Sequence, residues 1–285
     1  MGDNSQNFYY LPVLVGLLFC FYANHVWALP SNLSVKFLDI GQGDSILITT
    51  PNGRTVLIDG GPGTTILERL GEETGFWLKK IDLMLLTHPD LDHLEGLVEV
   101  LQRYQVDRVM MTGVMHGSAL YQTFLRLLEN NAPEVILVDP SMDWRIDTGV
   151  YLDMLYPVHS VAMREVDNVN DTSIVFKLIY GESTMFLGGD IEEDTEHELL
   201  MTDFDLTADV YKAGHHGSIT SNTQPLLDAI LAEQIVITSG RDNQFNHPHL
   251  ETVLRFDQMA TPWINTKDLG TITLSSNGQE WSVVE

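Results

Sequence analysis

The sequence contains little positive charge and almost no cysteine. Only 15 lysine and arginine side chains stand against 40 aspartates and glutamates, so the 285-residue chain has a formal net charge of −25. A surface of that charge repels polyanions at long range. This excludes nucleic-acid binding through broad basic patches and makes a long duplex an unsuitable partner. The single cysteine, Cys20, excludes an intrachain disulfide and a cysteine-ligated metal cluster.

The apolar run over residues 11–23 is shorter than the about 20 residues that a helix needs to cross a bilayer. Its length fits the core of an export signal, and the small side chains of Val26 and Ala28 fit a cleavage position. The segment before it contains no lysine or arginine, so an uncleaved anchor remains an alternative. We predict a signal peptide or N-terminal anchor over residues 1–28, an exported (periplasmic or secreted) protein, membrane contact through this segment alone, and one domain over residues 29–285.

Strand-like and helix-like segments alternate along the rest of the chain. Tight turns at Asn52-Gly53 and Gly181-Glu182 predict antiparallel hairpins in both halves. Two β-rich halves of this kind predict an α/β fold in which two mixed β-sheets pack face to face with helices outside, a four-layer αββα sandwich. The predicted strands cover residues 33–40, 45–50, 54–59, 81–87, 173–180, 184–187, 208–212, 234–238, 271–274 and 281–284.

Four side chains that can bind a metal occur within six residues: His88, Asp90, Asp92 and His93. They follow an apolar strand and precede apolar residues at helical spacing. Side chains two residues apart in an extended loop point to the same side, so His88, Asp90 and Asp92 can converge, with His93 beside them at the start of the helix. Imidazole and carboxylate groups at this density predict a metal site, with two ions expected. An exposed acidic turn is the alternative.

Two later segments also end an apolar strand in a small-residue turn that contains a metal-binding side chain. Asp190 ends the segment Phe186–Asp190, and His215 and His216 follow the strand over residues 208–212. Two divalent ions lower the pKa of a shared water, which can then attack an ester, a lactone, an amide or a phosphodiester. Since the sequence contains no phosphate-binding P-loop, dinucleotide fingerprint or serine elbow, hydrolysis is the predicted reaction class.

These residues resemble the metal-binding signature of the metallo-β-lactamase-fold hydrolases, with Asp90 where many members have a histidine. The finer resemblance is to the metallo-hydrolase domain of the ComEC-type DNA-uptake channel proteins, and it covers residues 35–275. The shared motifs, in order, are Phe37–Asp44 (FLDIGQGD), Ile58–Gly61 (IDGG), Leu86–His93 (LTHPDLDH), Asn170–Ser173 (NDTS), Leu187–Asp190 (LGGD), Lys212–Ser218 (KAGHHGS) and Asn246–Pro248 (NHP).

The resemblance implies a set of six metal ligands, three imidazoles and three carboxylates. Carboxylate enrichment favours hard ions such as Mn²⁺, while Zn²⁺ remains open. Many members of the superfamily have a further histidine where this chain has Asn170 and Asp171, so the first ion would be held more weakly. The implied ligands are His88 and Asp90 for the first ion, Asp92, His93 and His215 for the second, and Asp190 as a bridge between them.

The resemblance also implies roles around the ions. His216 and His247 would line the cleft, where they support the ligands or protonate the leaving group. Asp59 matches a position that usually braces the metal loop. The residues expected to take part in catalysis are therefore Asp92, Asp190, His216 and His247.

The implied activity is that of a phosphodiesterase or nuclease acting outside the cytoplasm. The net charge opposes a polyanionic substrate, so a small phosphodiester or a single strand is the expected partner. Hydrolysis of a small ester, lactone or β-lactam remains an alternative, and so does a non-catalytic metal-binding scaffold of the same fold. The family domain is usually fused to a multi-span channel. Since this chain contains no such region, we expect a stand-alone domain without a role in DNA uptake.

Overall fold

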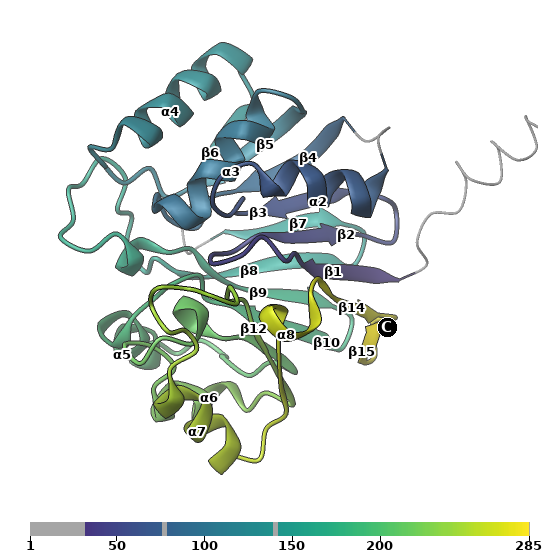
Figure 1. The fold of residues 1–285 in the computed structure, drawn as a ribbon, viewed down its shortest axis with the longest axis vertical. Helices are drawn as coiled ribbons and strands as arrows, with labels where there is room; N and C mark the ends of the chain where they lie inside the picture. Colours follow the sequence, from purple (N-terminus) through teal and green to yellow (C-terminus); the bar gives the residue numbers. More distant parts are fainter. Residues whose placement is uncertain (1–31, 76–78, 139–141, 285) are drawn as a thin grey trace, which may run out of the picture.

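The computed structural model describes residues 32–75, 79–138 and 142–284, and the predicted export segment over residues 1–28 lies outside them. Within these ranges two β-sheets lie face to face, with helices on both outer sides (Figure 1). This arrangement confirms the predicted four-layer αββα sandwich. None of the helices in these ranges has the length and hydropathy required to span a bilayer.

The first sheet has eight strands and is mixed, with an antiparallel half and a parallel half. The strands are antiparallel from β15 to β3 and parallel from β3 to β6. The last strands of the chain thus complete the sheet that the first strands begin. In spatial order the strands are β15 (Trp281–Val284), β14 (Ile272–Ser276), β1 (Leu33–Phe37), β2 (Ile46–Thr49), β3 (Thr55–Ile58), β4 (Lys80–Leu85), β5 (Gln105–Met111) and β6 (Glu134–Leu137).

The second sheet has seven strands and is mixed in the same way. Strands β13 to β10 are parallel, whereas β10 to β7 are antiparallel. The predicted hairpin around Gly181 is confirmed by the pairing of β9 with β10. In spatial order the strands are β13 (Trp263–Asn265), β12 (Gln234–Ile237), β11 (Val210–Lys212), β10 (Ser183–Leu187), β9 (Val175–Tyr180), β8 (Val150–Tyr156) and β7 (Asp143–Asp147).

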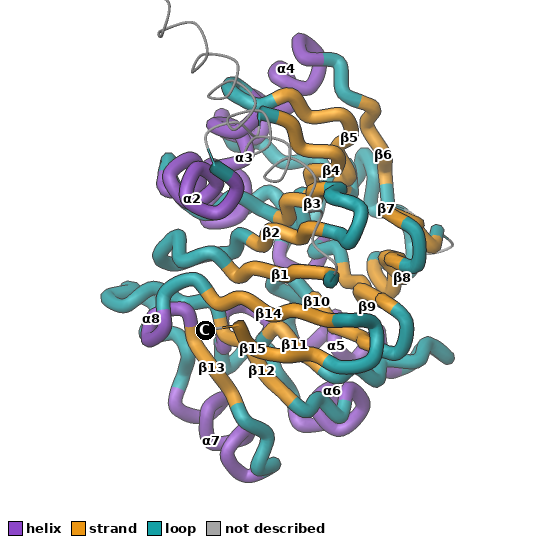
Figure 2. The backbone as a smooth tube through the Cα atoms, turned by 90° about the vertical axis from the view of Figure 1, so that its right-hand side faces the viewer, coloured by secondary structure: helices purple, strands orange, loops and turns teal. Residues whose placement is uncertain are grey.

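The helices divide between the outer faces of the two sheets (Figures 1 and 2). One group covers the first sheet and consists of α2 (Thr65–Thr74), α3 (Leu91–Leu101) and α4 (Ala119–Asn131). The other covers the second sheet and consists of α5 (Glu193–Leu200), α6 (Gln224–Ile230) and α7 (Leu250–Gln258). A short helix, α8 (Thr266–Leu269), follows β13, and two 3₁₀ turns, η1 (Asn170–Thr172) and η2 (Gly214–Gly217), follow β8 and β11.

Side chains alternate between the two faces of each strand, and this alternation gives three apolar cores. Ile46 and Ile48 of β2 face the second sheet, whereas Leu47 between them faces the helices. In the same way Met185 of β10 lies between the sheets and Phe186 packs under the outer helices of the second sheet. Each sheet is therefore buried on both faces, which explains why its strands read as nearly continuous apolar runs.

The sequence pattern missed β5, β6, β7, β8 and β13. Strands β6 and β7 lie at sheet edges and expose much of their length, so they lack a clear alternation of apolar and polar residues. Strand β5 has polar residues in its first half, Gln105, Asp107 and Arg108. Pairing with neighbouring strands, rather than local pattern, places these segments in the sheets.

Candidate metal centre

Polar side chains from both sheets converge at one edge of the sandwich. Asp59 follows β3, His88 follows β4, Asp190 follows β10, His216 follows β11 and Thr238 follows β12. Strands β3 and β4 are parallel neighbours, and so are β10, β11 and β12. Parallel strands bring their carboxyl ends to one edge, which is where α/β proteins place their sites.

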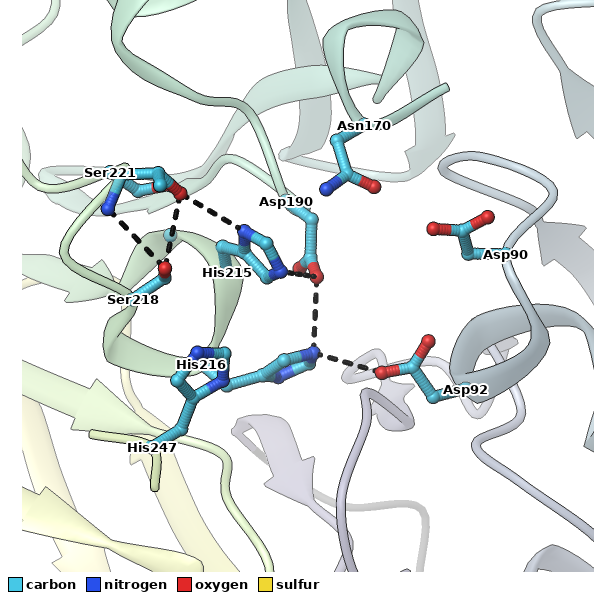
Figure 3. Close-up of polar contacts among 12 residues, drawn as sticks. Asp90, Asp92, Asn170, Asp190, His215, His216, Ser218, Ser221 and His247 are labelled. Atoms are coloured by element: carbon cyan, nitrogen blue, oxygen red, sulfur yellow. Dashed lines mark hydrogen bonds and ion pairs between the residues drawn. The ribbon is translucent and has the colours of Figure 1, made fainter. Parts of the chain in front are cut away.

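The centre of the cluster lies around Oδ2 of Asp190. Nε2 of His216 is 3.1 Å from this oxygen and Nε2 of His93 is 3.2 Å from it. Oδ2 of Asp92 is 3.4 Å from Nε2 of His216 (Figure 3), and the ring of His88 lies 4.1 Å from that of His93. His88, His93, Asp190 and His216 are each at most 2% exposed. We call these four residues the inner set.

Each imidazole of the inner set is held by a hydrogen-bonding group at Nδ1. Such outer partners fix the ring orientation and the tautomer of a metal-binding histidine. With Nδ1 occupied, Nε2 is the nitrogen that faces the centre. The pairs are His93 with Asp59 (2.8 Å), His216 with Asp44 (3.3 Å) and His88 with Ser173 (3.2 Å).

Four buried polar atoms of the inner set lack a well-formed hydrogen bond. Among the described residues, Nε2 of His88, His93 and His216 and Oδ1 of Asp190 are buried and make no hydrogen bond of good geometry. A buried polar atom left unsatisfied costs about 1–3 kcal/mol. Ligand atoms of Asp92, His93 and His216 lie within 4.8 Å of one another, and so do those of His88, His93 and Asp190. Imidazole nitrogen and carboxylate oxygen in such groups fit a divalent metal ion.

The pKa values show how strongly these groups interact. Burial alone lowers the pKa of His93 and of His216, but Asp190 and a second carboxylate outweigh it and raise both values well above the ordinary one. Burial raises the pKa of Asp190, yet His216 and His93 lower it well below its usual range. Burial, reinforced by His93, lowers the pKa of His88 to about 3, so this imidazole is neutral.

Two predicted metal ligands lie at the rim of the centre, outside the closest groups. Oδ2 of Asp90 is 3.9 Å from Nε2 of His88, and its side chain is 41% exposed. Nε2 of His215 is 3.8 Å from Oδ2 of Asp190, and Nδ1 of His215 is 3.2 Å from Glu192. The structure thus brings His216 closer to the centre than His215. The ligand roles of Asp90 and His215 stay predictions.

His247 lies beside the two adjacent histidines, His215 and His216 (Figure 3). Its ring is 5.3 Å from that of His215 and 6.1 Å from that of His216. Burial, with His216 as the next cause, lowers the pKa of His247 to about 3. A neutral imidazole at this position accepts a proton only at low pH, and its part in protonating a leaving group stays a prediction.

The segment with Asn170 and Asp171 turns its side chains to other partners. Asn170 donates a hydrogen bond to Glu192 (3.1 Å), and Asp171 accepts one from Thr195 (2.9 Å). Asp171 belongs to none of the candidate metal-binding groups found among the described residues. Asn170 therefore contacts the rim through Glu192, which also faces His215.

An unusual backbone turns the two adjacent histidines in different directions. His215 (φ 47°) and His216 (φ 54°) both adopt the left-handed conformation, which is costly for side chains other than glycine. Asn222 holds this turn, because its side chain donates to the carbonyls of Gly214 (2.9 Å) and Ser218 (3.2 Å). The strain is stored where the chain must present His216 inward.

The sequence motifs did not identify the buried support of the centre. Asp44 pairs with His216 across the two sheets, and Lys212 pairs with Asp44. Gly43 permits the loop before Asp44 to lie against the start of α3, because a Cβ there would lie 2.2 Å from the carbonyl oxygen of Asp92. Two signals were available: a lysine inside the short apolar strand β11, and the presence of both Asp44 and Lys212 in the shared motifs. The expected brace, Asp59, does contact the metal loop, since its carboxylate accepts hydrogen bonds from Thr87.

Comparison with known proteins agrees with this geometry. A family model described as the metallo-beta-lactamase superfamily matches residues 38–234. ComE operon protein 3 of Bacillus subtilis is 27% identical over 261 residues, which cover 86% of this chain and 33% of that protein. This match confirms the resemblance to the competence proteins. The chain spans about a third of the length of the curated relatives it matches.

A shorter match and a solved structure extend the comparison. Ribonuclease Z of Aeropyrum pernix is 32% identical over 110 residues, or 37% of this chain and 34% of that protein. The metallo-beta-lactamase fold protein YhfI from Bacillus subtilis superimposes with a TM-score of 0.59 at 12% identity, covering 86% of this chain and 100% of that one. At this identity the likeness shows the fold alone.

Proposed function

Because this chain belongs to the metallo-beta-lactamase superfamily, we propose that it is a metal-dependent phosphodiesterase acting on small or single-stranded substrates. The chain is a hydrolase of this fold with buried clusters of histidine and aspartate that suit a metal. The observation that carries the proposal is the convergence of three buried Nε2 atoms, none with a hydrogen bond of good geometry, beside the carboxylate of Asp190.

The inner set and Asp92 are the residues that would hold divalent ions. Oδ2 of Asp190 lies between His93 and His216 and suits a ligand shared by two ions. We assign His216, rather than His215, to this group, because its Nε2 is closer to Asp190 and it is buried. When bound, such ions supply Lewis acidity and a water of lowered pKa. The outer partners at each Nδ1 hold the rings in place.

A phosphodiester as the substrate is supported by one relative, whereas the net negative charge of the chain restricts its size. Ribonuclease Z, by its name, acts on RNA, and the shared segment is 32% identical over 110 residues. The net charge of −25 opposes a long polyanion. A pocket of about 690 Å³ beside His215 adds to this, because Asp167, Asp171 and Glu192 line it. A short single strand or a small phosphodiester meets less repulsion than a duplex.

The acidic pocket favours one alternative. A small neutral ester or lactone would enter it without the repulsion that a phosphodiester meets, and the same ions would serve its hydrolysis or that of a β-lactam. We place either activity outside the cytoplasm, and the apolar segment over residues 11–23 supports that placement.

The test compares four substrates with purified protein in Mn²⁺, Zn²⁺ or chelator: bis(p-nitrophenyl) phosphate, a single-stranded oligonucleotide, the matching duplex, and nitrocefin. We expect metal-dependent turnover of the first two, slower cleavage of the duplex, and loss of all turnover in Asp92→Asn. The control is His197→Asn, an exposed residue on α5 that should leave turnover unchanged. Turnover of nitrocefin alone would favour the alternative, and no turnover of any substrate would contradict the proposal.

A further inference from the structure

A lysine is buried directly behind the inner set. Lys212 lies in β11 and is 1% exposed. Its ammonium forms an ion pair with Asp44, donates a hydrogen bond to the carbonyl of Gly189 (3.2 Å), and lies 3.5 Å from Oδ1 of Asp190. A fully buried lysine is rare unless it is paired. The fold therefore keeps a positive charge on the inner side of Asp190.

The two oxygens of Asp190 face different partners. Oδ2 faces the imidazoles of His93 and His216, as described above. Oδ1 has no hydrogen bond and faces the ammonium of Lys212 at 3.5 Å. The carboxylate is thus oriented between a resident cation on one side and the proposed metal positions on the other.

Asp44 connects this ammonium to a second ligand. It lies between β1 and β2 of the first sheet, whereas Lys212 lies in β11 of the second sheet and His216 in the turn that follows it. Its carboxylate pairs with Lys212, lies 3.3 Å from Nδ1 of His216, and accepts a hydrogen bond from Thr238. All of these groups are at most 2% exposed. Movement of Lys212 would therefore affect both Asp190 and His216.

We propose that Lys212, held by Asp44, is a positioning residue of the metal centre. Its ammonium holds Oδ1 of Asp190 and leaves Oδ2 toward His93 and His216, where it could meet an ion, and it holds Asp44 against Nδ1 of His216. This inference rests on the proposed function, since it concerns ions that the centre would bind. Burial lowers the pKa of Lys212, but Asp44 and Asp190 outweigh it and raise the value, so the charge is retained.

A neutral side chain at position 212 would leave two carboxylates close together without their shared cation. Asp190 would then be free to turn either oxygen toward the ions, and Asp44 would lose the partner that fixes it beside His216. Loss of such an outer partner typically costs about 10–100-fold in metal affinity. A merely structural lysine would instead affect stability alone.

The experiment measures Mn²⁺ and Zn²⁺ affinity of chelator-stripped protein by calorimetry, together with its thermal unfolding. Lys212→Met should lower metal affinity about 10–100-fold, and Lys212→Arg should restore most of it. Lys212→Met leaves the buried charge of Asp44 unpaired, which could destabilise the fold by itself. The double variant Asp44→Asn/Lys212→Met removes that unpaired charge. It should unfold near the wild-type temperature and still bind metal weakly.

The matched control is Lys177→Met. Lys177 lies in β9, is 4% exposed and pairs with Asp205 (3.0 Å), so its loss also removes a buried lysine from its partner. It should lower the unfolding temperature and leave metal affinity unchanged. Wild-type metal affinity in Lys212→Met, or an equal loss in Lys177→Met, would overturn the inference. If the wild-type protein binds neither Mn²⁺ nor Zn²⁺, both the proposed function and this inference fail.

Discussion

The inner set and the rim of the metal centre differ in how firmly they are held. His88, His93, Asp190 and His216 are buried, and each imidazole has an outer partner at Nδ1. At the rim the side chains of Asp90 and His215 are 41% and 23% exposed. A prearranged group binds ions without losing side-chain freedom. The difference suggests that the inner set determines whether metal binds, whereas the rim adjusts which metal and which substrate.

The largest effect is expected at the centre of the inner set. Asp190→Asn should lower kcat/KM for bis(p-nitrophenyl) phosphate by about 1,000-fold or more, because several kcal/mol of charge stabilisation are lost at 1.36 kcal/mol per tenfold. Steady-state kinetics with saturating Mn²⁺ measure it, and circular dichroism checks the fold. A loss of less than tenfold would show that Asp190 does not hold the ions.

Two adjacent histidines give a direct comparison of the inner set with the rim. His216→Asn should lower metal affinity about 100-fold, because an inward nitrogen is lost. His215→Asn should lower it about threefold or less and act mainly on KM, because His215 faces Glu192 at the opening. Calorimetric titration of the two variants measures the contrast. Equal losses would remove the distinction between inner set and rim.

The pH dependence follows from the raised pKa values of His93 and His216. In metal-free protein their pairing with carboxylates stabilises the fold fully below the ordinary imidazole pKa of about 6.5, and this stability is lost as pH rises through the raised values. Metal binding requires neutral imidazoles, so it improves with rising pH. The increase in Tm on adding Mn²⁺ should therefore grow between about pH 6 and pH 9. An increase that shrinks with pH would contradict this assignment.

The smallest effect is expected at Asp90. Asp90→His should shift the ratio of Zn²⁺ to Mn²⁺ affinity about tenfold towards zinc, because imidazole suits zinc and carboxylate suits manganese. Competition titration with both ions measures the ratio. An unchanged ratio would show that Asp90 does not contact the ions.

Local sequence predicted the parts of the site that depend on local structure. The segment from His88 to His93 contains its ligands at fixed spacing after an apolar strand, and Asp190 follows a hairpin strand. The four-layer fold likewise followed from hairpins and alternating segments. In each case neighbouring residues determine the conformation.

The remainder depends on residues far apart in the chain. Asp44 meets Lys212 and His216 only after the two sheets pack together. Which of His215 and His216 turns inward depends on a left-handed backbone that Asn222 holds. No spacing rule predicts such contacts, because they form through tertiary packing.

The most direct test is a crystal structure of protein soaked in Mn²⁺ or Zn²⁺, with the ions located by anomalous scattering. We expect peaks about 2.0–2.2 Å from Oδ2 of Asp190 and from Nε2 of His93 or His216. No peak among these atoms, or peaks confined to the acidic pocket around Asp171 and Glu192, would contradict this expectation.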